Sequence, residues 1–174
     1  FFRRLTMALF DEKTCDKIGK YVDSTCSIFF KFISGQIIDG IIVGILVTIG
    51  MSIIGVKYAV LLGFMIGLFN IIPYFGAIVA VAISVLITLI TGGVSQTLIM
   101  AVVVIILQQI DSNIINPKII GNSLEISPLL VIFAVTVGGA YWGVLGMFLA
   151  VPVVAVLKII IDDWIEFRNS KKYA

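Results

Sequence analysis

The chain is 174 residues long, and 60% of its residues are hydrophobic, while 13% are charged, against about a quarter in an ordinary soluble domain. Between Lys57 and Asp111 lie 53 consecutive uncharged residues, and residues 126–157 form a second uncharged block. Because a bilayer crossing takes about 20 helical residues, these blocks exclude a soluble enzyme. They predict an all-α fold, that of a polytopic membrane protein.

The charged residues gather at the two ends of the chain. Six of the twelve lysines and arginines precede residue 37, and four follow residue 157. By the positive-inside rule we expect both ends in the cytoplasm, which requires an even number of crossings. Acidic residues interrupt both basic clusters, so the pattern does not favour a nucleic-acid partner.

The pattern along the chain divides it into three parts. Residues 1–36 are predicted to form an amphipathic helix, either cytoplasmic or lying on the bilayer surface, residues 37–161 the membrane domain, and residues 162–174 a cytoplasmic tail. Six hydrophobic segments are predicted within the membrane domain, at 37–54, 58–72, 75–91, 95–110, 128–141 and 143–161. The second and fifth are short for a full crossing, so we expect some segments to be broken or re-entrant, with tilted helices as the alternative.

A polar motif lies near the end of the second segment, where Asn70 stands three residues before Pro73. Proline has no backbone N–H, so it leaves a carbonyl one turn back without its usual donor. Such a carbonyl, together with the Asn70 amide, can bind a polar solute or a cation. The alternative is that Pro73 only bends or turns the chain.

The fourth segment ends in a stretch rich in amides, just before Pro117. If the helix continues, Gln109, Asn113 and Asn116 share one face, at spacings i, i+4 and i+7. Amides that face lipid lose hydrogen bonds at a cost of several kcal/mol, so we expect these three to line a solute path bent by the proline. The alternative is a helix end in the headgroup region.

Two carboxylates, Asp111 and Glu125, are the candidates for ion or proton coupling, because an ionisable group among apolar helices marks a functional site by default. The chain has no histidine, and its two cysteines are not arranged as Cys-x-x-Cys. The sequence therefore predicts no metal site, no cofactor and no nucleophile with its base, which argues against an enzyme.

Small residues spaced by four predict close contacts between helices. The pairs that we assign to helix packing are Gly63 with Gly67 and Gly139 with Gly143. Such pairs occur in transporters, in channels and in passive scaffolds, so they do not choose among these functions.

Several motifs occur together and in order, over about residues 30–162. They are Gly35-Gln36, Ile72-Pro-Tyr-Phe-Gly76, Gln108-Gln-Ile-Asp-Ser-Asn113, Asn116-Pro-Lys-Ile-Ile-Gly121, Ser127-Pro-Leu129, Gly138-Gly-Ala-Tyr-Trp-Gly-Val-Leu-Gly146 and Ala150-Val-Pro152. With them the chain resembles the C-terminal half of the autoinducer-2 exporter family of bacterial and archaeal membrane proteins. The resemblance implies a longer chain with further N-terminal helices, a multi-pass protein of a prokaryotic cell membrane, and assembly as a homo-oligomer in the bilayer.

The resemblance also implies transport, and it leaves the substrate open. Some members export the quorum-sensing signal autoinducer-2, and others exchange sodium or lithium for protons. Ser127 stands where many members have a histidine, so a proton relay through that side chain is not expected. Our leading hypothesis is a secondary transporter that exports a small polar solute along the amides, with the charge of Asp111 dispensable. The alternatives are a sodium(lithium)/proton antiporter centred on Asp111 and a non-transporting membrane scaffold.

Overall fold

The computed structural model describes residues 12–120 and 126–170. All its regular elements in these ranges are helical: α2 (Glu12–Ile53), α3 (Ala59–Phe69), α4 (Phe75–Ile110), the π-helix η1 (Asp111–Ile115), α5 (Asn116–Ile120) and α6 (Pro128–Ser170). Three stretches are long and apolar enough to cross a membrane, within Ile18–Ile53, Phe75–Ile119 and Pro128–Glu166. The predicted all-α, polytopic membrane fold is confirmed.

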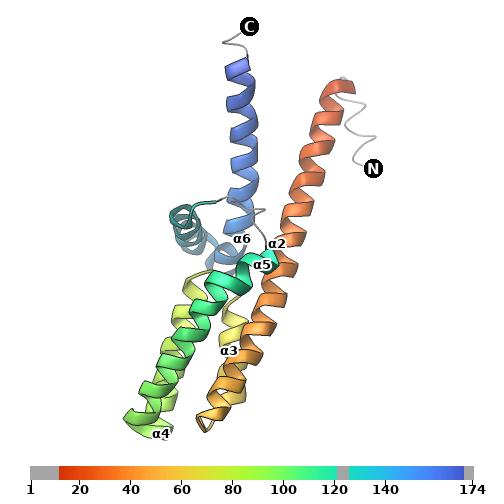
Figure 1. The fold of residues 1–174 in the computed structure, drawn as a ribbon. Coiled ribbons are helices and arrows are strands. Elements are labelled where there is room, and N and C mark those ends of the chain that lie inside the picture. Colours follow the sequence, from red (N-terminus) through yellow and green to blue (C-terminus); the bar gives the residue numbers. More distant parts are fainter. Residues whose placement is uncertain (1–11, 121–125, 171–174) are drawn as a thin grey trace.

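Two of the long helices, α4 and α6, are sharply bent (Figure 1). Gly93, with φ 76° and ψ 179°, divides α4 into two arms, and Gly143, with φ 61°, divides α6 just after Trp142. These φ values are costly for residues that carry a Cβ atom, so glycine is the residue suited to both turns. Further turns lie at Gly55 and Pro73, so these breaks fall where boundaries between hydrophobic segments were predicted. The exception is the polar stretch from residue 111, which begins as a helical continuation of α4.

Helices α2 and α3 touch through their backbones. A Cβ atom on Gly67 would collide with the carbonyl oxygen of Gly40, and one on Gly63 would lie 2.9 Å from the carbonyl oxygen of Gly44. Glycine is needed at these positions because a larger residue would separate the helices. Gly63 and Gly67, predicted as packing residues, therefore lie at this contact.

Gly139 and Gly143, the other predicted packing pair, lie at the bend of α6. A Cβ on Gly139 would meet the side chain of Met147, in the second arm of the same helix. Gly143 has open space around it and makes the turn itself, while Gly138 and Gly146 provide the close backbone approach between the two arms.

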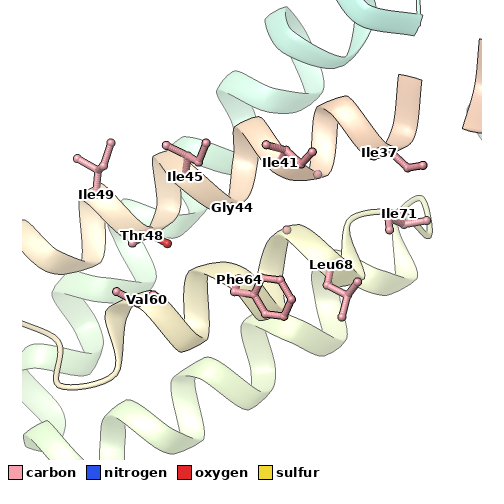
Figure 2. Close-up of a pocket in the computed structure, with 12 residues that line it drawn as sticks. Ile37, Ile41, Gly44, Ile45, Thr48, Ile49, Val60, Phe64, Leu68 and Ile71 are labelled. Atoms are coloured by element: carbon pink, nitrogen blue, oxygen red, sulfur yellow. The ribbon is translucent and has the colours of Figure 1, made fainter. Parts of the chain in front are cut away.

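Helix α2 runs unbroken past residue 36, where a boundary with the membrane domain was predicted. From there it presents two faces. The buried face carries Asp39, Val43, Val47 and Met51, each one turn after the previous residue. The opposite face carries isoleucines, and with α3 it borders an apolar groove of about 510 Å³ (Figure 2). The groove is lined by Ile37, Gly40, Ile41, Gly44, Ile45, Thr48, Ile49, Val60, Phe64, Gly67, Leu68 and Ile71.

The buried side chains form two hydrophobic clusters. The first, here the bundle cluster, joins α2, α3 and both arms of α4 through Val43, Val47, Met51, Val56, Ala59, Leu62, Ile66, Ala80, Met100 and Val104. The second, here the α6 cluster, contains Phe32, Ile72, Ala134, Val135, Ala150 and Val151. Along α2 the polar residues near position 39 come after Phe32 and before Val43. They therefore lie between the two clusters.

Candidate functional site

Two buried carboxyl groups share one amide in the interior of the bundle. Asp39 of α2 is fully buried, Asp111 at the start of η1 is 4% exposed, and Asn70, at the end of α3, is 8% exposed. Asn70 Nδ2 donates to Asp39 Oδ2 at 2.8 Å and to Asp111 Oδ2 at 3.2 Å. An amide nitrogen carries two hydrogens, so one can serve each acid. Asn70 thus holds together two acids that are 72 residues apart in the sequence.

The π-helix η1 brings a fourth side chain to this site, that of Asn116 at the start of α5. In a π-helix the backbone bond joins residues i and i+5, and here the N–H of Asn116 donates to the carbonyl of Asp111. This spacing brings Asp111 and Asn116 toward one side, where Asn116 Nδ2 donates to Asp39 Oδ2 at 3.4 Å. The site therefore consists of Asp39, Asn70, Asp111 and Asn116, named here the acid-pair site.

The next residue, Pro117, gives a physical reason for the widened turn. Proline supplies no N–H, and its ring clashes with the carbonyl four residues earlier in a regular α-helix. A π-turn relieves this crowding by spreading the backbone. Pro117 was predicted to bend the solute path, and it lies directly after the turn that positions Asn116.

The electrostatics of the pair favour a bound positive charge. Both acceptor oxygens bond to the same nitrogen, so they lie no more than about 6 Å apart. Two unit charges at that distance repel by about 3 kcal/mol at an effective dielectric constant of about 20. Within the described residues, no lysine or arginine acts on either carboxyl. A proton or a monovalent cation bound to the pair would remove this repulsion.

Four buried polar atoms around the pair have no hydrogen-bond partner among the described residues. Two are carboxyl oxygens of the acids, Asp39 Oδ1 and Asp111 Oδ1. The others are Oε1 of Gln36 and Nε2 of Gln108, one helical turn before Asp39 and Asp111 respectively. Buried polar atoms in native proteins nearly always bond to protein, water or a ligand, so a small polar partner is expected at these four atoms.

The structure brings three of the predicted site residues together and separates the rest. Asn70, Asp111 and Asn116 meet at the acid-pair site. Gln109 and Asn113 lie on the exposed surface and bond to each other, because Asn113 Nδ2 donates to the Gln109 carbonyl at 2.7 Å and to its Oε1 at 3.3 Å. The π-helix changes the register after residue 110, so the predicted single face of three amides does not form.

The remaining candidates lie outside the contacts of the acid-pair site. Pro73 is half-buried in the turn between α3 and α4, where its carbonyl accepts from the N–H of Phe75 at 2.8 Å. Pro117 is exposed in α5, and Glu125 lies outside the described residues.

Sequence reasoning missed Asp39 and gave no site role to the neighbouring glutamines, Gln36 and Gln108. Asp39 is the third residue of a segment predicted to be hydrophobic, and an acid in that position is a signal of function. A second signal was the repeated spacing Gln-x-x-Asp, found at Gln36 with Asp39 and at Gln108 with Asp111. Neither signal shows that Asp39 and Asp111 come together in space.

Residues 2–166 match the family described as AI-2E family transporter. The chain belongs to this family. Its relatives include two proteins of Bacillus subtilis that are provisionally named as transport proteins. YrrI is 36% identical over 139 residues, covering 80% of this chain and 39% of the relative, and YueF is 37% identical over 142 residues, covering 82% and 37%. YhhT of Escherichia coli K12, with a name of the same kind, is 27% identical over 123 residues, or 71% and 34% of the two chains.

This AI-2E family chain thus spans less than half the length of these relatives. Family membership and its long apolar helices make it part of a multi-pass membrane protein. The acid-pair site is built entirely from residues within the matched region.

Proposed function

We propose that the full-length protein is a cation-coupled secondary transporter, in which the acid-pair site binds the coupling cation. The observation that carries this proposal is the double hydrogen bond of Asn70 to Asp39 and Asp111. It joins two uncompensated carboxyls at the meeting point of three helical elements. Binding or release of a cation changes the repulsion between the acids, and this change can drive a rearrangement of the helices that carry them.

A passive scaffold does not explain the acid-pair site. Burial of an ionised carboxyl costs several kcal/mol, and a packing role is better served by apolar side chains of similar volume. Apolar residues and glycines already provide the contacts between α2 and α3 in this chain. Buried acids in apolar helices therefore favour ion movement over scaffolding.

The two hydrophobic clusters favour a carrier over an open channel. On α2, Phe32 of the α6 cluster and Val43 of the bundle cluster lie on either side of Asp39 along the helix. The rings of Phe32 and Phe148 lie 5.8 Å apart and add an aromatic contact on the α6 side. A carrier holds its site closed from each side in turn, and a polar site between two apolar clusters suits that cycle.

The resemblance suggests a small polar solute, such as the autoinducer-2 signal, as the exported substrate. A sodium(lithium)/proton antiporter is the second candidate, and the pair of acids favours it. In that case protons and metal ions alternate at Asp39 and Asp111. Both candidates require the same two acids, so one set of variants tests the shared mechanism.

The test is transport by the full-length protein in proteoliposomes under an imposed pH gradient. Autoinducer-2 efflux and sodium-dependent proton movement are measured separately. We expect Asp39→Asn and Asp111→Asn each to lose most of the coupled flux while keeping a measurable remainder, whereas Asp23→Asn, which changes an exposed acid on the same helix as Asp39, should leave it intact. Normal coupled flux in either of the first two variants would overturn the proposal.

A further inference from the structure

The acid-pair site has an additional amide on each side along the bundle. Two contacts of α2 give its direction relative to α4. Asp39 accepts a hydrogen bond from Asn116, and Gly50, eleven residues further along α2, lies next to Val103 and Leu107. Residue numbers thus rise along α2 as they fall along α4, so these helix segments are antiparallel. Figure 1 shows the same arrangement, with α2 and the second arm of α4 running in opposite directions.

Because each glutamine precedes its acid by three residues, antiparallel helices place the two amides on opposite sides of the pair. Three residues correspond to a rise of about 4.5 Å, so Gln36 and Gln108 lie about 9 Å apart along the axis. Gln36, which is 2% exposed, lies toward the α6 cluster, and Gln108 lies toward the bundle cluster. The two amides thus bracket the acids along the axis.

The four buried atoms without a hydrogen-bond partner are donors or acceptors that a water molecule can satisfy. Asp39 Oδ1 and Gln36 Oε1 are both acceptors, and one water molecule can donate to both. On the other side, a second water can donate to Asp111 Oδ1 and accept from Gln108 Nε2. Two water molecules therefore satisfy all four atoms, each of which would otherwise cost about 1–3 kcal/mol.

We propose that Gln36 and Gln108 each hold a water molecule against the neighbouring acid, and that these waters exchange protons with the acid pair from opposite sides. This proposal rests on the proposed function and makes the proton its coupling cation. In each step, an O–H bond of the hydrated proton breaks while a bond forms from that hydrogen to a carboxylate oxygen. Water remains behind, and release on the other side reverses the step. Gln36 and Gln108 are positioning residues, because they act through the water.

The ionisable groups of the surrounding helices leave the acid pair as the titrating unit in this region. Helix α3 and both arms of α4 carry no charged residue, and η1 contributes Asp111 itself. On α5, Lys118 is exposed, and the charged residues of α6 begin at Lys158, beyond the α6 cluster. The pH dependence of coupled transport should therefore come from the acids and their waters.

The experiment uses the full-length protein in proteoliposomes, with Gln36→Met and Gln108→Met compared with Gln109→Met. Methionine has nearly the shape of glutamine and cannot hold the water. Gln109 is the matched control because it is adjacent to Gln108 in the sequence but exposed. Proton movement is followed with a trapped pH dye. The transport rate and KM for autoinducer-2 or sodium, whichever the wild type moves, are measured from pH 5 to 9.

We expect each of the first two variants to slow proton movement about tenfold or more and to flatten the pH profile, with the substrate KM unchanged. Gln109→Met should behave as the wild type. Gln36→Asn keeps an amide and leaves room for water, so it should retain most of the activity and shows that loss in Gln36→Met is not misfolding.

Other results would overturn this inference and remain distinct from failure of the proposed function. A normal rate and pH profile in Gln36→Met and Gln108→Met, with most of the coupled flux lost in Asp39→Asn, would reject the water relay and keep the acid pair. A raised KM with an unchanged pH profile would assign the glutamines to solute binding and reject the relay. If Asp39→Asn itself transported normally, the proposed function would fail.

Discussion

Replacement of Asn70 by alanine should destabilise the protein more than any other single amide change in the described chain. The change deletes hydrogen bonds of 2.8 Å and 3.2 Å to two buried carboxyls. Hydrogen bonds to charged groups contribute about 1.5–3 kcal/mol each, so their loss in an unrelaxed site would cost about 3–6 kcal/mol. Water entering the space left by the amide recovers part of this, and we expect a net loss of about 3 kcal/mol.

The measurement is reversible unfolding of the full-length protein in mixed detergent micelles. Asn113→Ala is the matched control, since Asn113 is exposed and bonds to Gln109; it should change the free energy of unfolding by less than about 0.5 kcal/mol. In Asn70→Ala/Asp111→Asn one of the two repelling charges is gone, so the double variant should be more stable than Asn70→Ala. Equal stability of Asn70→Ala and Asn113→Ala would refute the shared role of Asn70.

Three further predictions concern packing, a turn and topology. A Cβ atom on Gly67 would collide with the facing carbonyl of α2, so Gly67→Ala should cost about 1–3 kcal/mol in unfolding experiments. Gly19 has open space inside the same α2 helix, so Gly19→Ala should instead stabilise the protein by up to about 1 kcal/mol. Gln96 Nε2 donates to the carbonyl of Gly55 at 2.9 Å, and Gln96→Leu should speed amide exchange in that turn. Single cysteines replacing Lys20 and Arg168 should both label from the cytoplasm in intact cells; labelling from opposite faces would contradict an even number of crossings.

The membrane fold and most of its breaks could be predicted because their causes are local. A long run of apolar residues predicts a crossing helix whatever surrounds it. Glycines such as Gly93 and Gly143 mark the sharp turns through their own conformational freedom. Gly63 and Gly67 could be assigned to helix packing from their spacing of four residues, because glycines lined up on one helix face allow another helix to approach closely.

The acid-pair site could be predicted only in part, because its contacts depend on the fold. The amide face was derived for a regular α-helix, whereas the π-helix changes the register and leaves Asn113 on the surface and Asn116 at the site. Asp39 was overlooked because a single acid near the start of an apolar segment looks like a helix end. Its role becomes visible only when Asn70 is seen to join it to Asp111.

The shared amide also changes the expectation for Asp111. The hypothesis of a solute path lined by amides left the charge of Asp111 dispensable. Beside a second buried acid, a charge on Asp111 has an electrostatic role. Gln109 and Asn113 bond to each other on the exposed surface of the described chain, so their place in a solute path stays a prediction. We therefore propose coupling at the two acids in place of an uncoupled path.

The most direct test of coupling at a joint site is a double-mutant cycle on Asp39 and Asp111. Proton-coupled flux is measured in proteoliposomes for Asp39→Asn, Asp111→Asn and the variant that carries both changes. Residues that act as one unit are not additive, so we predict that the double variant loses no more flux than either single variant. Independent losses that multiply in the double variant, or a single variant that keeps its full coupled flux, would contradict the joint site.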